Sequence, residues 1–499
     1  MHSTARTYSL IGVDAREVRV EADVRVGLPS FAVVGLPDVA IREARERVRS
    51  AIVNSGFKFP QHRITANLAP ADLRKTGPGF DLALAAAVLD ASGQLPPGVL
   101  DGSALIGELA LDGSVRPVAG VLAMAEAAGR ACAAALVVPH ECGGEAALVD
   151  GLRVIAIERL SQLAEIGGDD EPAPPSPLAL EVNGASGELP DLADLRGQPT
   201  LAYALEVAAA GGHSLIMIGP PGAGKSMAAR RLPSLLPPLD AAEAVEAIRV
   251  ASACGRPLGP LVGGARPFRA PHHTVSAAGL LGGGSPPCPG EISLAHRGVL
   301  FLDELPEFRR DVLEALRQPL EDGRVVISRA RSSVELPCRF QLVAAANPCP
   351  CGHGPGSQLC ECPEPSVRRY SAKLTGALAD RIDLCLRLSQ PSRAALGGGP
   401  GPASALVRER VLAARERQRA RLGRGRTNAQ MTSQETRERS ELTPQAWALM
   451  GEERAGPKLS GRGFDRLIRI ARTLADLEAN EAVSVEQIAA AMSLRAEAR

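Results

Sequence analysis

The chain has few aromatic residues, no excess of charge of either sign and no long apolar run. Aromatic side chains make up 3% of its 499 residues, which argues against an extended base-stacking platform of the kind that binds single-stranded nucleic acid. Its 56 Lys and Arg residues equal its 56 Asp and Glu residues, so a globally basic nucleic-acid coat is excluded. A basic channel inside a ring would not show in this sum.

No uncharged apolar run reaches the ~18 residues that a membrane helix needs. The first residues, MHSTARTYSLIG, lack the basic and apolar regions of a signal peptide. Ten cysteines are too sparse for a disulfide scaffold. We therefore expect a cytoplasmic protein with no membrane partner, and the length suggests about three domains.

Residues 167–190 form the clearest boundary, because they are rich in Gly, Pro, Ser and acids and have no apolar period. Before this linker, in residues 1–166, short β-branched runs alternate with helical stretches, which indicates an α/β domain. Residues 191–395 contain all-apolar strands typical of a parallel sheet. Residues 396–499 have Ala, Arg, Glu and Leu at helical spacing. The predicted fold class is α/β, with an all-helical C-terminal lid.

A phosphate-binding loop follows the first strand predicted after the linker. Residues 219–226, GPPGAGKS, match G-x-x-x-x-G-K-[ST] between a strand and a helix, a setting that disfavours a chance Gly/Pro loop. Backbone N–H groups and the helix N-terminus make an anion cradle, Lys225 would reach the β- and γ-phosphates, and Ser226 would hold Mg²⁺. The predicted cofactors are ATP and Mg²⁺. The predicted nucleotide-binding residues are Gly219, Pro220, Pro221, Gly222, Ala223, Gly224, Lys225, Ser226 and Met227.

Two acids end the next apolar strand, GVLFLDE at 298–304. Asp303 is positioned to bind Mg²⁺ through water, and Glu304 to polarise the attacking water, which favours hydrolysis over simple nucleotide binding. Asn347 ends a further apolar strand, where its amide could orient that water. Taken alone, an asparagine at this place is more often a turn residue, but as the third element after the two preceding motifs Asn347 fits a sensor 1 position.

From Asp191 onward the chain resembles the magnesium-chelatase-like AAA+ ATPases, specifically their ComM (YifB) branch. The resemblance implies a homo-hexameric ring with ATP bound between subunits, with Arg381 as the arginine finger and Arg462 as sensor 2. A surface salt bridge is the alternative for each arginine. The segments that carry the resemblance are LRGQ at 195–198, PFRAPHHTVS at 267–276, GEISLAHRGVLFLDELPEF at 290–308, NPCPCG at 347–352, ALADRIDL at 377–384 and SGRGFDRLIRIARTLADL at 460–477.

Residues 324–336, RVVISRARSSVEL, have the pattern of a β-hairpin, at the place where this clade inserts a pore hairpin. Six copies of Arg324, Arg329 and Arg331 would line a channel with positive charge, which suits sequence-independent contacts with DNA phosphates. The alternative is a solvated hairpin face.

An earlier insertion contains His272 and His273, for which a loop role is favoured over metal binding.

Four cysteines, Cys349, Cys351, Cys360 and Cys362, form C-x-C-x₈-C-x-C in a Gly- and Pro-rich loop just after Asn347. Four thiolates could hold a structural Zn²⁺ that stabilises a loop with no core of its own. Reduced thiols and a disulfide or redox switch are the alternatives.

The N-terminal domain resembles the protease domain of Lon, through GPGFDLALA at 77–85 and ALIGELALDGSVRPVAGVLAMAEAA at 104–128. Lon requires a Ser nucleophile and a Lys base. Gly79 and Leu122 occupy the matching positions, which argues strongly against peptide hydrolysis and leaves a scaffold, as a ring layer or a DNA-binding surface.

Together these patterns predict an ATP-driven hexameric helicase that migrates DNA branches during recombination in natural transformation. Its predicted partners are branched or single-stranded DNA and a recombinase. The alternatives are a chelatase motor subunit, a protein-remodelling ATPase and a non-enzymatic scaffold; the complete set of ATPase motifs argues against the last.

Overall fold

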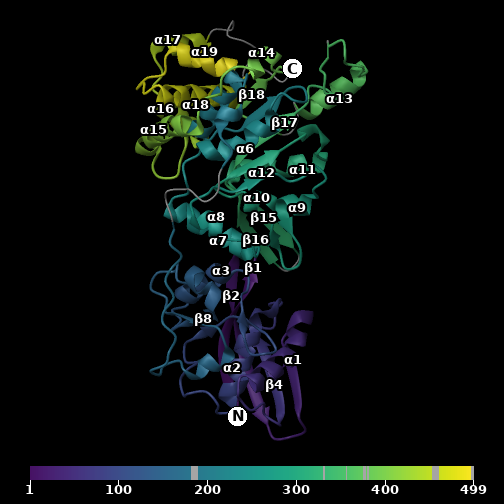
Figure 1. The fold of residues 1–499 in the computed structure, drawn as a ribbon, viewed down its shortest axis with the longest axis vertical. Coiled ribbons are helices and arrows are strands. Elements are labelled where there is room, and N and C mark those ends of the chain that lie inside the picture. Colours follow the sequence, from purple (N-terminus) through teal and green to yellow (C-terminus); the bar gives the residue numbers. More distant parts are fainter. Residues whose placement is uncertain are drawn as a thin grey trace.

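The computed structural model describes residues 1–180, 189–329, 332–355, 357–374, 378, 381–451 and 460–495. They form two lobes stacked along the long axis of the molecule, with the N-terminal lobe at one end and the helical lid at the other (Figure 1). Within these ranges, no helix combines the length and the apolar character needed to cross a membrane.

The N-terminal lobe is built on a seven-stranded mixed sheet of order β3-β4-β2-β1-β5-β8-β9. The pair β1–β2 is a long antiparallel hairpin, whereas β1, β5, β8 and β9 run parallel to one another. The strands are β1 (His2–Ile11), β2 (Asp14–Arg25), β3 (Ser30–Val34), β4 (Arg63–Ala69), β5 (Ala104–Leu105), β8 (Leu136–Pro139) and β9 (Val154–Ile157), with a small hairpin of β6 (Glu108–Leu109) and β7 (Val115–Arg116).

Helices cover both faces of this sheet. Along β8, Val137 packs with the cluster under α2, while Leu136 and Val138 pack with the cluster under α3. This alternation is that of a strand buried on both sides. The helices are α1 (Val39–Asn54), α2 (Asp81–Ala91), α3 (Val121–Arg130) and α4 (Gly143–Ala146).

The first strand, β1, was not among the strands that the sequence predicted. Its inward-facing residues include Ser3, Thr7 and Ser9, each at most 6% exposed. Because hydroxyl-bearing residues occupy the buried positions, the alternation of apolar and polar residues that marks a half-buried strand is weak here.

The second lobe contains a five-stranded sheet of order β11-β14-β17-β10-β18, parallel throughout. Met217 and Phe301 face one core cluster, and Ile218 and Leu302 face the other, so the sheet is buried on both sides. The predicted α/β fold with a parallel sheet is confirmed. The strands are β10 (Leu215–Ile218), β11 (Phe268–Arg269), β14 (Val299–Leu302), β17 (Gln341–Ala346) and β18 (Leu384–Arg387).

Helices and two short hairpins surround this sheet. The helices are α5 (Pro199–Gly211), α6 (Lys225–Leu235), α7 (Ala241–Ala253), α8 (Gly259–Val262), α9 (Ala277–Leu281), α10 (Glu291–Leu294), α11 (Arg310–Ala315), α12 (Arg317–Asp322), α13 (Glu364–Leu374) and α14 (Arg393–Leu396). The hairpins are β12 (Gly282–Gly283) with β13 (Cys288–Pro289), and β15 (Arg324–Arg329) with β16 (Ser332–Pro337).

The C-terminal lid is helical, as predicted. Its helices α15 and α18 pack against α5 of the core, and Val407, Val411 and Ile470 join the core cluster there. The short helix α16, which begins at a Thr432 capping box, was not predicted. The lid helices are α15 (Ser404–Leu422), α16 (Ser433–Arg439), α17 (Pro444–Gly451), α18 (Gly461–Leu477) and α19 (Val485–Ser493).

Candidate active site

The loop of residues 219–224 joins β10 to α6 at the carboxyl edge of the parallel sheet. Gly222 and Gly224 have φ of 79° and 88°, a left-handed conformation that glycine adopts without strain. The ammonium of Lys225 donates to the carbonyl oxygens of Gly219 and Pro220 and, at 3.0 Å, to Oδ1 of Asn347. Burial lowers the pKa of Lys225. The structure thus brings Lys225 and Asn347 together.

Ser226 and Asp303 meet beside this loop. The Ser226 hydroxyl donates to Oδ2 of Asp303 at 2.7 Å, and the backbone N–H of Glu304 donates to Oδ1 at 3.0 Å. A hydroxyl oxygen and a carboxylate side by side are the hard ligands that Mg²⁺ takes in phosphate-binding sites. The two predicted Mg²⁺ ligands therefore fit that ion.

Glu304 has φ of 52°, a left-handed backbone that is rare outside glycine and that clusters at functional sites. Its side chain is 56% exposed, and Oε2 lies 3.4 Å from Nδ1 of His273. The imidazole of His273 packs against that of His272, with ring centroids 4.1 Å apart. No sequence pattern places His273 beside Glu304, because the two lie in separate segments of the chain.

Helix α13 also contacts this site. The backbone of Asn347 hydrogen-bonds the Tyr370 hydroxyl, and burial raises the pKa of Tyr370 to about 12. The ammonium of Lys373 donates to the carbonyl of Pro306, just after Glu304. Neither Tyr370 nor Lys373 belongs to a nucleotide-binding motif, so no motif predicts their place at this site.

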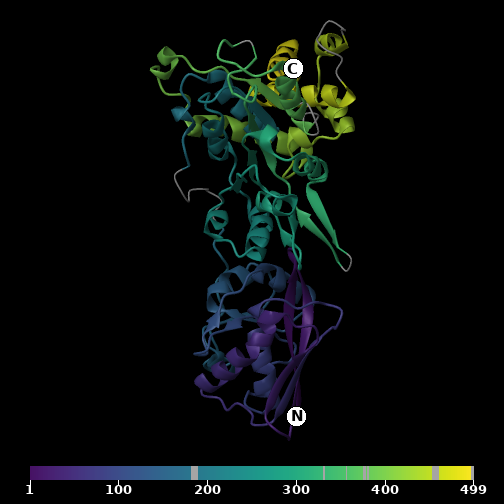
Figure 2. The same ribbon diagram turned by 90° about the vertical axis from the view of Figure 1, so that its right-hand side faces the viewer.

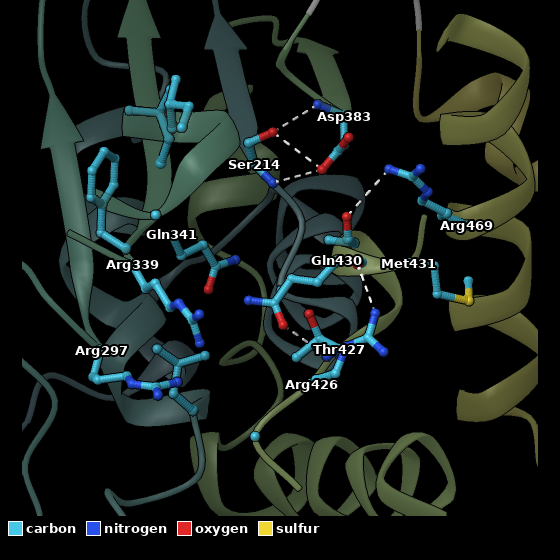
Figure 3. Close-up of a pocket in the computed structure, with 18 of the residues that line it drawn as sticks. Ser214, Arg297, Arg339, Gln341, Asp383, Arg426, Thr427, Gln430, Met431 and Arg469 are labelled. Atoms are coloured by element: carbon cyan, nitrogen blue, oxygen red, sulfur yellow. Dashed lines mark hydrogen bonds between the residues drawn. The ribbon is translucent and has the colours of Figure 1, made fainter. Parts of the chain in front are cut away.

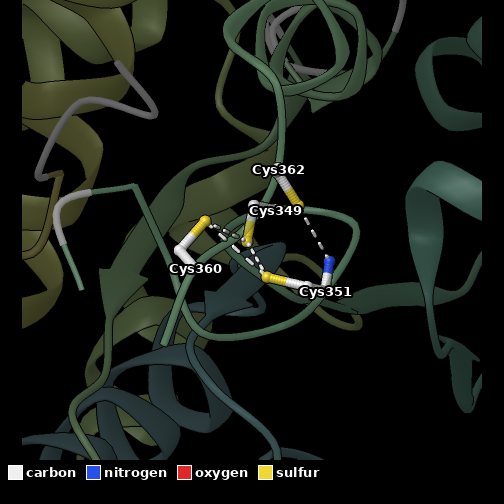
Figure 4. A group of neighbouring side chains, drawn as sticks. All are labelled: Cys349, Cys351, Cys360 and Cys362. Atoms are coloured by element: carbon white, nitrogen blue, oxygen red, sulfur yellow. Dashed lines mark hydrogen bonds between the residues drawn. The ribbon is translucent and has the colours of Figure 1, made fainter. Parts of the chain in front are cut away.

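The four cysteines that follow Asn347 converge (Figure 4). Their sulfur atoms all lie within 4.8 Å of one another; Sγ of Cys360 is 3.7 Å from those of Cys349 and Cys351. The N–H of His353, together with the neighbouring thiols, lowers the pKa of Cys351 to about 6. Four sulfur donors at this spacing fit tetrahedral Zn²⁺.

The cysteine loop also touches the phosphate-binding loop. A Cβ added to Gly352 would lie 3.0 Å from Cδ of Pro221 and 4.0 Å from Nδ2 of Asn347. Gly352, the residue after Cys351, therefore lies beside Pro221 of the phosphate-binding loop.

Arg381 and Arg462 lie together, but away from the phosphate-binding loop. Nη2 of Arg381 is 2.8 Å, and Nη1 of Arg462 is 3.6 Å, from Oε1 of Glu321. Both line a cavity of about 960 Å³ between the core and the lid. Ser214 and Gln341, at the amino ends of β10 and β17, line it too (Figure 3). Lys225 and Asn347 follow the carboxyl ends of those strands, on the opposite edge.

The predicted β-hairpin at 324–336 is confirmed as β15–β16; we call it the pore hairpin after the role proposed for it below. Arg324 is paired across the strands with Glu335, at 3.1 Å to both carboxylate oxygens. Arg331 and the side chain of Arg329 lie outside the described residues.

Comparison with known proteins covers nearly the whole chain. The family description "Magnesium chelatase, subunit ChlI" matches residues 191–396, with related descriptions matching 20–142 and 401–495. YifB of Escherichia coli is 41% identical over 497 residues, which is 99% of this chain and 97% of YifB. An uncharacterized Mycobacterium tuberculosis protein is 43% identical over 498 residues, which is 97% of this chain and 96% of that protein.

Of two further relatives, one matches nearly the whole chain and the other about a quarter of it. "Competence protein ComM" of Haemophilus influenzae is 41% identical over 497 residues, which is 98% of this chain and 96% of ComM. Lon protease 2 of Bacillus subtilis is 28% identical over 141 residues, which is 28% of this chain and 25% of that protease. The chain therefore belongs to the ComM/YifB family of magnesium-chelatase-like AAA+ ATPases, whose cofactors are ATP and Mg²⁺.

Proposed function

We propose that this protein is a cytoplasmic, ATP-hydrolysing hexameric motor that migrates DNA branches during homologous recombination in natural transformation. The observation that carries the ATPase assignment is the convergence of Lys225, the Ser226–Asp303 pair, Glu304 and Asn347 at one edge of the sheet. The DNA assignment is supported by the similarity to ComM, whose name links it to competence, and by the pore hairpin.

The site supports hydrolysis in steps that its own residues carry out. Lys225 and the backbone of Gly222 and Gly224 would bind the phosphates, and bound Mg²⁺, held by Ser226 and Asp303, would offset their charge. Glu304 would accept a proton from the attacking water, and Asn347 would orient that water. His273 would hold the Glu304 carboxylate in place, which makes it a positioning residue.

Arg381 and Arg462 are proposed to act on the neighbouring subunit. Their position beside Glu321, on the edge of the sheet opposite Lys225, supports action on a second copy's phosphates rather than on their own. Hydrolysis would then depend on ring assembly.

Mixing two inactive variants tests this arrangement. Arg381→Ala keeps its phosphate-binding loop, and Lys225→Ala keeps its Arg381. In mixed rings, the loop of the first would face the arginine of the second, and ATP hydrolysis should reappear. If the mixture stays as inactive as either variant alone, Arg381 does not act between subunits.

The proposed DNA contact lies at the tip of the pore hairpin. Arg324 forms an ion pair with Glu335. We therefore propose that Arg329 and Arg331 are the residues that contact DNA phosphates. Six such tips would give sequence-independent, salt-dependent binding to single-stranded or branched DNA, on which a recombinase partner would also act.

The cysteine cluster is proposed to hold Zn²⁺ as a structural ion. The fit of four sulfurs within 4.8 Å supports this, as does the contact of Gly352 with Pro221. The bound ion would fix the loop that supports Asn347 and the phosphate-binding loop.

The alternatives are a chelatase motor subunit, which the family description matched at 191–396 favours, and a protein-remodelling ATPase. Measuring ATP hydrolysis with single-stranded DNA, a porphyrin or an unfolded polypeptide separates the three. We expect stimulation by DNA alone. Stimulation by polypeptide or porphyrin, with none by DNA, would replace the proposed substrate.

A further inference from the structure

The tip of the β1–β2 hairpin, residues Ile11–Asp14, reaches out of the N-terminal lobe into the second lobe (Figures 1 and 2). The N–H of Gly12 donates to the carbonyl of Pro287 at 3.2 Å. Val13 is 3% exposed and belongs to a core cluster of the second lobe, together with Val334 and Leu336 of β16. The hairpin tip is therefore packed against the root of the pore hairpin.

Only glycine fits at the centre of this contact. Gly12 has φ of 66°, and a Cβ added to it would lie 2.3 Å from Cγ1 of Val334 and 2.9 Å from Cδ2 of Leu336. Both neighbours are buried, at 4% and 0% exposed, so neither can move aside into solvent. The backbone of the tip and the side chains of β16 lie in direct contact.

Helix α7 anchors the tip from the side. Nε of Arg249 donates to the carbonyl of Val13 at 2.9 Å, and its guanidinium pairs with Asp14 and, at 3.3 Å, with Glu126 of α3. Arg249 thus ties two elements of the N-terminal lobe to the second lobe.

The positions that match the Lon nucleophile and base lie at this same joint. Gly79 lines a cavity of about 270 Å³ together with Gly12 and the segment Pro286–Cys288 of the second lobe. Leu122 is 1% exposed and packs with Ile248 of α7. A region that resembles a protease site is here built into the contact between the lobes.

We propose that the hairpin tip is a clamp on the pore hairpin, through which the N-terminal lobe restrains the pore hairpin and sets its response to ATP turnover. The clamp has two contacts with the insertions of the second lobe: β16 packs on Gly12 and Val13, and Pro287 accepts a hydrogen bond from Gly12. The clamp follows from these contacts alone. Its consequence for DNA rests on the proposed function.

Hydrogen exchange of the full-length protein tests the clamp, with Gly12→Ala compared with Gly56→Ala. Gly56 also has positive φ, at 85°, but its Cβ would meet nothing within 4 Å, so this control shares the backbone strain without the clash. In Gly12→Ala, amides of 324–329 and 332–337 should exchange about five- to thirtyfold faster, the effect of losing a contact of ordinary strength. Amides of β10 and β14 should be unchanged.

Arg249→Ala supplies a second variant that leaves Gly12 intact, and it should raise exchange in the same residues. Equal exchange of the pore-hairpin amides in Gly12→Ala, Arg249→Ala and the control would overturn the clamp. This conclusion does not depend on whether DNA stimulates ATP hydrolysis. DNA stimulation of ATP hydrolysis is then measured on the same proteins. Faster exchange with no DNA response in any variant, wild type included, would leave the clamp in place and count against the DNA motor.

Discussion

The ammonium of Lys225 and the amide oxygen of Asn347 are joined by a hydrogen bond of 3.0 Å. Lys225 begins α6, and Asn347 follows β17, which lies beside β10 in the sheet. The phosphate-binding lysine and the candidate water-orienting amide are therefore held in one geometry by two adjacent parallel strands.

Replacing this amide should slow hydrolysis without abolishing ATP binding. Asn347→Ala removes the amide proposed to orient the attacking water, and loss of one such group lowers kcat by about 100-fold or more. ATP affinity should change little, because Lys225 keeps the carbonyls of Gly219 and Pro220. Asn480→Ala, in the lid, is the matched control. Equal kcat in both variants would remove Asn347 from the site.

Glu304→Gln should retain ATP binding and lose turnover, because an amide cannot accept the proton of the attacking water. We expect kcat to fall by about 100- to 10,000-fold, the range ascribed to general-base catalysis. Glu307→Gln is the control, since Glu307 lies exposed in the following turn. Single-turnover kinetics would show the difference, and normal hydrolysis by Glu304→Gln would refute the assignment of the base.

His273→Ala should reduce kcat more than His272→Ala does. Only His273 contacts the Glu304 carboxylate, at 3.4 Å, whereas Nδ1 of His272 contacts Thr274. Displacement of the base by about 1 Å costs up to about 100-fold in rate, while ATP affinity should be retained. Equal effects of the two substitutions would show that the pair has a shared structural role instead.

Zinc analysis should find about one ion per chain bound by the four thiolates. Cys360→Ser with Cys362→Ser should remove the ion and lower the melting temperature. The control is Cys132→Ser with Cys288→Ser, because both of those thiols are exposed and lie outside the cluster. Metal retained in the first double variant, or absent from the wild type, would contradict a zinc site.

Removing both tip arginines of the pore hairpin should weaken DNA binding, whereas Arg324→Ala should have little effect because Glu335 already pairs with that guanidinium. For Arg329→Ala with Arg331→Ala, affinity should fall alike for all sequences, and the salt dependence should decrease by about one unit per lost contact. Titrations at several salt concentrations measure both quantities. Unchanged affinity would place the DNA contact elsewhere.

Local patterns were sufficient for the parts of the site that lie at strand ends. The apolar strands before Gly219, Asp303 and Asn347 predicted a parallel sheet, and the carboxyl ends of such strands share one edge. The cysteine cluster was also predictable from local sequence, because its four residues lie close together in the chain.

Contacts between distant segments do not follow from local sequence patterns. Nothing in the insertion that carries His273 specifies Glu304 as its neighbour. The pairing of Arg381 with Glu321 depends on packing within the core, and the approach of Arg462 to Glu321 depends on how the lid docks on it. The position of Gly12 against Val334 depends on how the two lobes meet. Each of these is fixed by tertiary packing rather than by local periodicity.

Branch migration on a labelled three-strand junction tests the central claim most directly, with wild type and Lys225→Ala compared in the presence of ATP and Mg²⁺. The account predicts strand exchange by the wild type and none by Lys225→Ala, which lacks the ammonium that binds the phosphates. No exchange by a wild-type protein whose ATP hydrolysis is indifferent to DNA would contradict the DNA motor.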